Sequence, residues 1–228
     1  MPDRRLYLFD IDGTLISTGG AGSSAMRLAF TAIWRIDDGF NGVEFSGRTD
    51  RAILRDALVS NELNDGPFME HLRRFKRAYF RRLPGTLESY EGTVLPGVVG
   101  LLRELAQDDS ATVSLGTGNF RNSAAMKLRY YGIDQFFEFG YGGFGDRTED
   151  RASMIEHGIR SARRASGKHA TVIVIGDTAH DIAAAKANNA VAVGVATGTT
   201  DEEGLSKAGA DLVLPSLEGA AKVLRARS

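Results

Sequence analysis

The chain has 228 residues, no cysteine, and 28 basic against 29 acidic side chains, which gives a formal net charge of −1. Its apolar share of 43% and charged share of 25% are those of an average globular protein, and its length exceeds the usual domain size of roughly 100–150 residues. These figures exclude a disulfide scaffold, a cysteine-ligated zinc site and a cysteine nucleophile, and the even charge argues against nucleic acid as a partner.

The first predicted element is a short strand, 6–9, which runs directly into Asp10 and Asp12. Basic residues precede it, as in a signal peptide, but the apolar run breaks at Asp10 and no small-residue cleavage site follows. No stretch of the chain approaches the roughly 18 consecutive apolar residues that a membrane span requires. We therefore expect a cytoplasmic protein with no membrane partner, and the sequence leaves open whether it is a monomer or a homodimer.

The next interval, of about ninety residues, is far longer than an ordinary connection between a strand and a helix. Its apolar spacing predicts three amphipathic helices, 25–36, 50–59 and 68–83, whose apolar stripes can pack against one another. Glycine- and serine-rich joints, 17–24 and 91–97, bracket the interval. A single thick domain is one interpretation. We favour an inserted helical cap, residues 18–90, on a core formed by residues 1–17 and 91–228.

From about residue 94 to the end, short apolar runs alternate with helical patterns. The runs 112–115, 171–175, 191–196 and 212–214 are rich in Val, Ile and Leu, and most carry apolar residues on both faces. Such runs suit parallel strands that helices cover on each side. The sequence therefore predicts an α/β fold: a doubly wound, Rossmann-like parallel sheet with an inserted all-helical cap domain.

Four aspartates lie where two of these strands end. Asp10 and Asp12 are two residues apart, so their side chains point to one side, and Asp177 and Asp181 share one face of a turn that opens a helix. Ligands of an open parallel sheet bind at the carboxyl ends of its strands. If these ends converge, a hard divalent ion such as Mg²⁺ would offset the repulsion among the carboxylates. The alternative is that the aspartates only cap turns and helices.

Thr117, Gly118 and Asn119 lie in a glycine-rich turn between the second strand and a helix. A hydroxyl, main-chain amides and a helix dipole at such a turn favour an anion such as phosphate. An ordinary strand–helix turn is the alternative. A phosphate cradle, a divalent metal and a free carboxylate together are the parts of phosphoryl transfer through a covalent aspartyl-phosphate.

Three segments of the chain resemble the motifs of the haloacid dehalogenase superfamily. Residues 9–15, 115–119 and 176–181 read FDIDGTL, LGTGN and GDTAHD, in the order in which that family carries them. The likeness covers essentially the whole chain. It is similar, more narrowly, to the phosphoglycolate-phosphatase-like branch, in which a helical cap is inserted after the first motif.

The resemblance implies a role for each aspartate, matched by position. Asp10 would be the nucleophile and a metal ligand. Asp12 would bind the metal through its main-chain carbonyl, protonate the leaving alcohol and then activate the hydrolytic water. Asp177 would be a metal ligand, and Asp181 a ligand or a support for one.

The phosphate site that the resemblance implies consists of Thr117 and the amides of Gly118 and Asn119. The acid at Asp12 indicates the reaction class, because the dehalogenases of this superfamily lack an acid at that position and need no metal. Halide chemistry is therefore disfavoured.

The third motif departs from the family, which has a lysine, often Lys-Pro, at the start of the helix before the last acidic strand. No Lys-Pro occurs in this sequence. Arg151 opens the helical pattern in the matching interval, so we take it as the catalytic cation, with Arg147 as the second candidate. An arginine offers a fork of donors where a lysine offers a point charge. The alternative is a solvated arginine with no role in catalysis.

Two basic features lie in the predicted cap. Arg48 belongs to a loop that related caps present to the site, where it either binds an anionic group of the substrate or caps a helix with Asp50. Residues 71–82 form a basic cluster whose apolar members hold helical spacing, so the basic side chains are expected on the exposed face of a helix. Attraction of phosphorylated substrates is the alternative for this cluster.

These features predict a Mg²⁺-dependent phosphatase that hydrolyses a small phosphorylated metabolite, with cap closure excluding bulk water during transfer. Phosphoglycolate is the substrate that the resemblance implies. One alternative is a sugar phosphomutase resembling β-phosphoglucomutase, which shares these motifs. Another is a non-catalytic, phosphate-binding regulatory protein that has kept the fold.

Overall fold

The computed structural model describes residues 4–167 and 169–226, so residues 1–3, 168 and 227–228 of the predicted core lie outside the described residues. Across the described ranges, six strands form one parallel sheet in the order β5-β4-β1-β6-β7-β8. This confirms the predicted parallel α/β sheet. The strands are β1 (Arg5–Phe9), β4 (Ala111–Thr117), β5 (Gly143–Phe144), β6 (Thr171–Gly176), β7 (Val191–Val195) and β8 (Leu212–Leu214).

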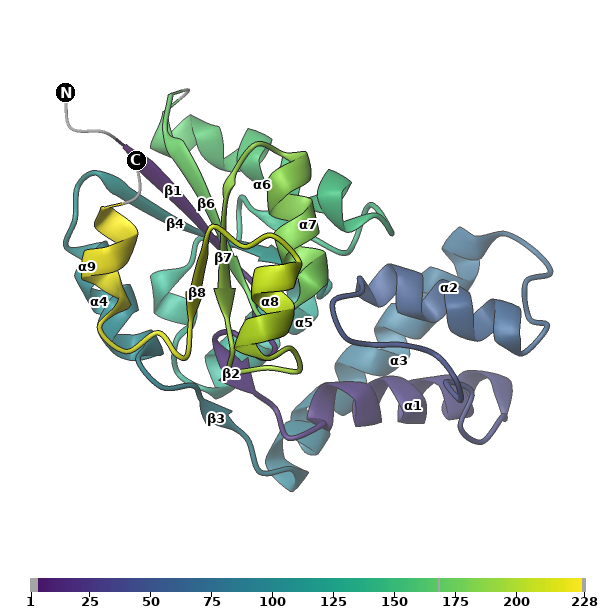
Figure 1. Cartoon of the computed structure of the whole chain (residues 1–228). Helices are drawn as coiled ribbons and strands as arrows, with labels where there is room; N and C mark the ends of the chain where they lie inside the picture. The colour runs from purple at the N-terminus through teal and green to yellow at the C-terminus, as the bar shows by residue number, and fades with distance from the viewer. Residues whose placement is uncertain (1–3, 168, 227–228) are drawn as a thin grey trace.

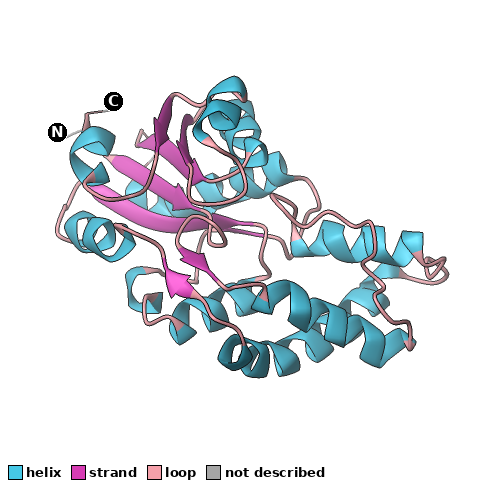
Figure 2. Ribbon diagram, turned by 60° about the horizontal axis from the view of Figure 1, so that its bottom comes forward, coloured by secondary structure: helices cyan, strands magenta, loops and turns pink. Residues whose placement is uncertain are grey.

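Strand β1 lies inside this sheet, and its side chains point alternately into two separate cores. Tyr7 and Phe9 belong to one core, and Leu6 and Leu8 belong to the other. Helices cover both faces, as Figures 1 and 2 show, and this explains the nearly continuous apolar character of the strands. The helices of the sheet region are α4 (Val98–Ala106), α5 (Arg121–Tyr130), the 3₁₀ helix η1 (Asp134–Phe136), α6 (Arg151–Ser166), α7 (Ala179–Ala187), α8 (Glu202–Lys207) and α9 (Ala220–Arg225).

Two further strands form a small ribbon at the point where the chain leaves the sheet region and returns to it. Strand β2 (Ile16–Ser17) pairs antiparallel with β3 (Thr93–Val94). The sequence did not predict them, nor the short β5, because a segment of two residues has no detectable period. Parts of the predicted joints 17–24 and 91–97 are thus tied together by the ribbon.

Between the two strands of the ribbon lies a group of three helices, which stands beside the sheet in Figure 1. We call residues 18–90 the helical insertion. The three predicted helices are confirmed, while the division into a core and a separate cap domain at residues 17/18 and 90/91 stays a prediction. The helices are α1 (Ala21–Trp34), α2 (Asp50–Ser60) and α3 (Phe68–Ser89).

The helical insertion has a hydrophobic core of its own, rich in aromatic rings such as Phe30, Phe75 and Tyr79. One member of this core comes from the sheet region. Phe120, the residue before α5, is fully buried and packs edge-on against Tyr79 and Phe80. The turn at the end of β4 is therefore packed against the insertion.

Two helix boundaries differ from the prediction by four residues or more. Helix α1 begins at Ala21 instead of 25, because Gly20 takes the left-handed conformation (φ 98°) that starts the helix, and Ala21 and Gly22 are buried. Helix α3 continues through Pro84 to Ser89, because the apolar contacts of Leu87 bury its last turn. Neither α3 nor any other helix of the described residues has the length and apolar character to cross a membrane.

Most basic residues of the cluster 71–82 lie on the exposed face of α3, as predicted. Lys76 is the exception that bears on the site, since it is partly buried and paired with Asp146 of the sheet region. The cluster thus contributes a contact between the insertion and the sheet region.

Candidate active site

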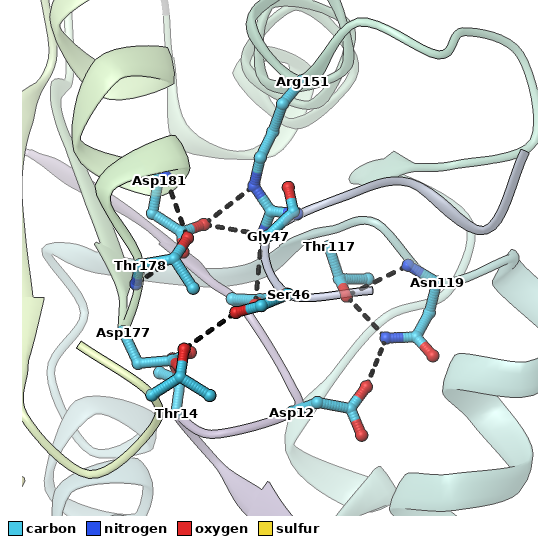
Figure 3. A network of polar contacts seen from close by, with 12 residues as sticks. Asp12, Thr14, Ser46, Gly47, Thr117, Asn119, Arg151, Asp177, Thr178 and Asp181 are labelled. Atoms are coloured by element: carbon cyan, nitrogen blue, oxygen red, sulfur yellow. Dashed lines mark hydrogen bonds and ion pairs between the residues drawn. The ribbon is translucent and has the colours of Figure 1, made fainter. Parts of the chain in front are cut away.

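A cavity of about 490 Å³ lies between the carboxyl ends of the strands and the helical insertion. The sheet region contributes Asp10, Asp12 and Asp177 to its walls, and the insertion contributes Arg48 and Asp50. The predicted convergence follows from topology, because β4, β1 and β6 are neighbouring parallel strands that end at the same edge. Figure 3 shows the polar side chains that meet there.

Three of the four predicted carboxylates form one cluster. Asp10, Asp177 and Asp181 are buried, and each offers an oxygen within 4.8 Å of the others. The Thr14 hydroxyl donates a hydrogen bond to Asp177 Oδ1 at 2.9 Å. Gly198 lies so close to Asp177 that a Cβ at this position would be 1.7 Å from Oδ2, so only glycine fits there. The fourth carboxylate, that of Asp12, lies outside this cluster.

The electrostatics of the cluster suit a divalent cation. Burial raises the pKa values of Asp10 and Asp177, and the neighbouring carboxylates raise them further, while Arg151 lowers both. A single arginine thus faces three buried acids. A set of carboxylate oxygens at this spacing is the donor set that a hard ion such as Mg²⁺ takes, and the ion's charge would offset the repulsion. The described residues therefore fit a divalent metal.

Arg151 is the first residue of α6 and is held at the centre of the site. Asp150 provides the N-cap of this helix by accepting a hydrogen bond from Ser153 N at 2.6 Å. The buried guanidinium of Arg151 has Nη2 3.1 Å from Asp10 Oδ2 and 2.6 Å from Asp181 Oδ1. By contrast, the alternative candidate Arg147 is exposed and does not line the cavity.

Asp181 is fully engaged by neighbouring donors. Its Oδ1 accepts from Nε and Nη2 of Arg151, at 2.9 and 2.6 Å. Its Oδ2 accepts from the main-chain N and the hydroxyl of Thr178, at 3.1 and 2.6 Å, which completes a capping box at the start of α7. The carboxylate does not line the cavity. Of the two predicted roles for Asp181, this geometry favours support of Arg151 and the metal site.

The turn after β4 joins Asp12 in a second network. Asn119 Nδ2 donates to Thr117 Oγ1 at 3.0 Å and to Asp12 Oδ2 at 2.8 Å. Lys127 Nζ lies 2.9 and 2.6 Å from the two Asp12 oxygens and 2.7 Å from Asn119 Oδ1. The side chain of Asp12 is thereby held beside the predicted phosphate turn.

Gly118 lets the insertion approach this turn closely. A Cβ at Gly118 would lie 2.2 Å from the main-chain oxygen of Arg48, and Arg151 Nη1 donates to the oxygen of the adjacent Gly47 at 3.1 Å. The loop before α2 therefore rests directly on the site. The Arg48 side chain lines the cavity and donates to Asp56 Oδ2 at 2.6 Å.

Of the two roles considered for Arg48, helix capping with Asp50 is not what the structure shows. Thr49 is the N-cap of α2 and accepts from Ala52 N at 3.1 Å. Asp50 instead reaches into the sheet region, where its Oδ2 accepts from Phe120 N at 2.8 Å. Arg48 remains a candidate for contact with the substrate.

Two polar residues of the site were missed from the sequence, Lys127 and Asp50. Lys127 occupies a buried position of α5 between Ala124 and Leu128, so a lysine within an apolar stripe was the signal that could have identified it. Asp50 had no such signal, since its partners Phe120 and Ser123 come from another element.

The model of the haloacid dehalogenase-like hydrolase family matches residues 5–189 of the chain. The chain is 27% identical to the probable phosphatase IndB of Dickeya dadantii (strain 3937) over 202 residues. This match covers 86% of this chain and 84% of that protein. It is 26% identical over 199 residues to the phosphoglycolate phosphatase of Agrobacterium fabrum (strain C58 / ATCC 33970), covering 86% and 82%. It also resembles the crystal structure of a predicted phosphatase from Clostridium acetobutylicum, with a TM-score of 0.71 and 20% identity over 97% and 98% of the two chains. Since the family model spans most of its length, and its motifs meet at one cavity, this chain belongs to the haloacid dehalogenase-like hydrolases.

Proposed function

We propose that this hydrolase is a Mg²⁺-dependent phosphatase that cleaves a small phosphomonoester through an aspartyl-phosphate on Asp10. Phosphomonoester hydrolysis is the activity that its family and its phosphatase-named relatives support. The observation that carries the proposal is the setting of Asp10. Its buried carboxylate faces a cavity, beside two further acids and the guanidinium of Arg151.

The metal would be held by Asp10, Asp177 and the main-chain carbonyl of Asp12, with Asp181 in support. When bound, the ion neutralises the charge of the phosphate and of the acids around it. Gly198 and the Thr14 hydroxyl keep the Asp177 carboxylate in place for this role.

The transferring phosphate would be bound by the Thr117 hydroxyl, the amides of Gly118 and Asn119, and Arg151. An oxygen of Asp10 attacks phosphorus, and the bond from phosphorus to the ester oxygen breaks. Asp12 gives a proton to the departing alcohol. In the second half, Asp12 takes a proton from a water molecule that attacks phosphorus, which restores the Asp10 carboxylate and releases inorganic phosphate.

The leaving group of the substrate would lie against the helical insertion, which acts as a cap. Arg48 is the residue that we assign to an anionic group on the substrate, and phosphoglycolate is the leading candidate because a relative carries that name. A cavity of about 490 Å³ suits a small metabolite. The cytoplasmic location stays a prediction.

The test is a phosphate-release screen over many phosphomonoesters, with Mg²⁺ and with a chelator, for the wild type and Asp10→Asn. We expect release with Mg²⁺ only, and none from the variant, because asparagine keeps the size of the side chain but removes the nucleophilic charge. Matching circular dichroism spectra would show that both proteins are folded.

Three outcomes would contradict the proposal. Residual activity of Asp10→Asn above a few per cent would exclude the covalent route on Asp10. Isomerised sugar phosphate without free phosphate would indicate the mutase alternative, and the absence of turnover on every substrate would favour the regulatory one.

A further inference from the structure

Lys127 is a buried cation that no motif of the chain accounts for. Its side chain comes from the second turn of α5 and is only 4% exposed, although it lines the cavity. Burial of an ammonium group is costly unless charged and polar partners surround it. We propose that Lys127 is a positioning residue, which fixes the Asp12 carboxylate for proton transfer to the leaving group. This inference rests on the proposed phosphatase function.

The contacts of the ammonium group are directed at Asp12. Lys127 Nζ lies 2.9 and 2.6 Å from the two carboxylate oxygens, so it holds both ends of the group. The Asp12 side chain itself is 41% exposed and follows the strand in an irregular segment. Among the described residues, the hydrogen bonds to this carboxylate come from Lys127 and Asn119. Without Lys127, a single amide donor would orient it.

The same ammonium group connects Asp12 to the predicted phosphate site. Lys127 donates to Asn119 Oδ1 at 2.7 Å, and Asn119 Nδ2 donates to Thr117 Oγ1 at 3.0 Å. Displacing the ammonium would therefore release the carboxylate and loosen one side chain of the turn. The role that these contacts give Lys127 is geometric, because its ammonium group orients the Asp12 carboxylate and the Asn119 amide.

The wall behind Lys127 is shaped to hold the ammonium in this position. Helix α1 of the insertion approaches it at Gly22, where an added Cβ would lie 3.1 Å from Nζ and 3.3 Å from Cε. A methyl group there would push the lysine by a few tenths of an ångström and leave its charge in place. The other atom within 4 Å of that Cβ, Thr18 Oγ1, lies at 4.0 Å, an ordinary contact distance, so Gly22→Ala acts mainly on the position of Lys127.

The experiment compares kcat/KM for two kinds of substrate, because a poor leaving group needs a proton and a good one does not. Lys127→Met is expected to lower kcat/KM on an alkyl phosphomonoester by about a hundredfold, the size of a general-acid contribution, and on p-nitrophenyl phosphate by much less. In an Asp12→Asn background, Lys127→Met should cause little additional loss. Lys186→Met, which removes a lysine paired with Asp211 on the protein surface, is the matched control and should behave as wild type.

Equal losses on both substrates, or a full additional loss in the Asp12→Asn background, would overturn the inference and leave the phosphatase function standing. A wild type that releases phosphate from no phosphomonoester of the screen would overturn both. Should Lys127→Met fail to fold, Gly22→Ala decides the matter. This variant is expected to lose more kcat/KM on the alkyl phosphomonoester than on p-nitrophenyl phosphate, by a smaller factor than Lys127→Met. A ratio of the two kcat/KM values equal to that of the wild type would contradict the inference.

Discussion

Arg151 is the residue on which the charge balance of the acidic cluster depends. Its guanidinium contacts Asp10 and Asp181, and it lowers the pKa values of Asp10 and Asp177 against the effect of burial. The single side chain thus serves two purposes. It compensates buried negative charge in the resting protein and supplies donors to the phosphate in the proposed reaction.

Arg151→Ala should therefore affect both rate and stability. We expect kcat to fall about 10²–10³-fold, as after removal of a donor that stabilises a transition state, and the free energy of unfolding to fall by about 3 kcal/mol, because two buried carboxylates lose their cation. Arg151→Lys should recover part of the rate, since it restores the charge without the fork of donors. Phosphate release and urea unfolding measure the two effects.

Arg147→Ala is the matched control, because Arg147 is exposed and does not line the cavity. Its activity should equal that of the wild type. An unchanged rate in Arg151→Ala together with a loss in Arg147→Ala would reverse the assignment of the cation.

The site residues differ in how far the sequence could predict them. Asp10 and Asp177 directly follow buried strands, so their position at one edge follows from the parallel sheet alone. Arg151 could be predicted because it opens a helix in the expected interval. The contacts of Lys127 and Asp50 could not be predicted, since their partners come from elements that only the tertiary fold brings together.

At the scale of elements, the start of α5 is capped by an acidic side chain from another helix. Its own N-cap residue, Phe120, makes no side-chain cap hydrogen bond. Asp50 of α2 provides one instead, by accepting from Phe120 N at 2.8 Å and from the Ser123 hydroxyl at 3.3 Å. The start of the helix that carries Lys127 is thus capped by the helical insertion.

This arrangement predicts a pH dependence of stability. Burial raises the pKa of Asp50 to about 6, against the opposing effects of Lys127 and of the hydrogen bond from Phe120. Because the folded protein then holds this proton more tightly than the unfolded chain, the contribution of Asp50 to stability increases as the pH falls through 6 toward 4. Asp50→Asn lacks this proton. The free energy of unfolding of the wild type minus that of Asp50→Asn should therefore rise by about 2 kcal/mol when the pH is lowered from about 7.5 to about 4.5.

Urea unfolding at the two pH values measures this difference. The contributions of the other titrating groups are the same in both proteins and cancel. Asp37→Asn, an exposed acid of the same insertion, serves as the control and should show no such change. A difference between wild type and Asp50→Asn that stays constant with pH would mean that Asp50 is no more basic in the folded protein than in the unfolded chain.

The predictability of the elements depended on their length. Strands β1, β4, β6, β7 and β8 contain apolar runs that the sequence revealed, whereas β2, β3 and β5 have two residues each and owe their existence to their partners. The start of α1 was misplaced because Gly20 and Gly22 resemble a flexible joint, although Gly22 is buried against Lys127. Glycine required by close packing looks the same in a sequence as glycine in a loop.

At the scale of the whole molecule, ion pairs hold the helical insertion over the cavity. Glu149, just before α6, accepts from Arg51 Nε at 3.3 Å and from Arg55 Nε at 2.7 Å, both from α2. Lys76 of α3 pairs with Asp146 nearby. These contacts join the helical insertion to the segment just before α6, the helix that begins with Arg151.

Glu149→Gln should weaken the contact between the helical insertion and the sheet region. Partly exposed ion pairs contribute less than about 1 kcal/mol each, and Glu149 makes two, so we expect KM to rise no more than about thirtyfold with kcat nearly unchanged. The dependence of KM on salt should also be weaker than in the wild type, because a charged contact that salt screens is gone. Steady-state kinetics at two salt concentrations measure both effects.

Glu203→Gln removes a glutamate that is paired with Lys207 on the exposed face of α8, and it controls for the loss of one surface charge. It should leave KM and its salt dependence as in the wild type. Identical behaviour of the two variants would mean that the pairs at Glu149 have no part in closure.

The position of Phe120 has a consequence for protein engineering. Its ring is part of the hydrophobic core of the insertion, while its main chain continues the turn of Gly118 and Asn119 at the end of β4. A chimera that exchanges residues 18–90 for the insertion of a relative would leave this ring facing a foreign surface. The natural unit of recombination in this enzyme is therefore the insertion together with Phe120, two segments that are separated in the chain and that must be exchanged as one.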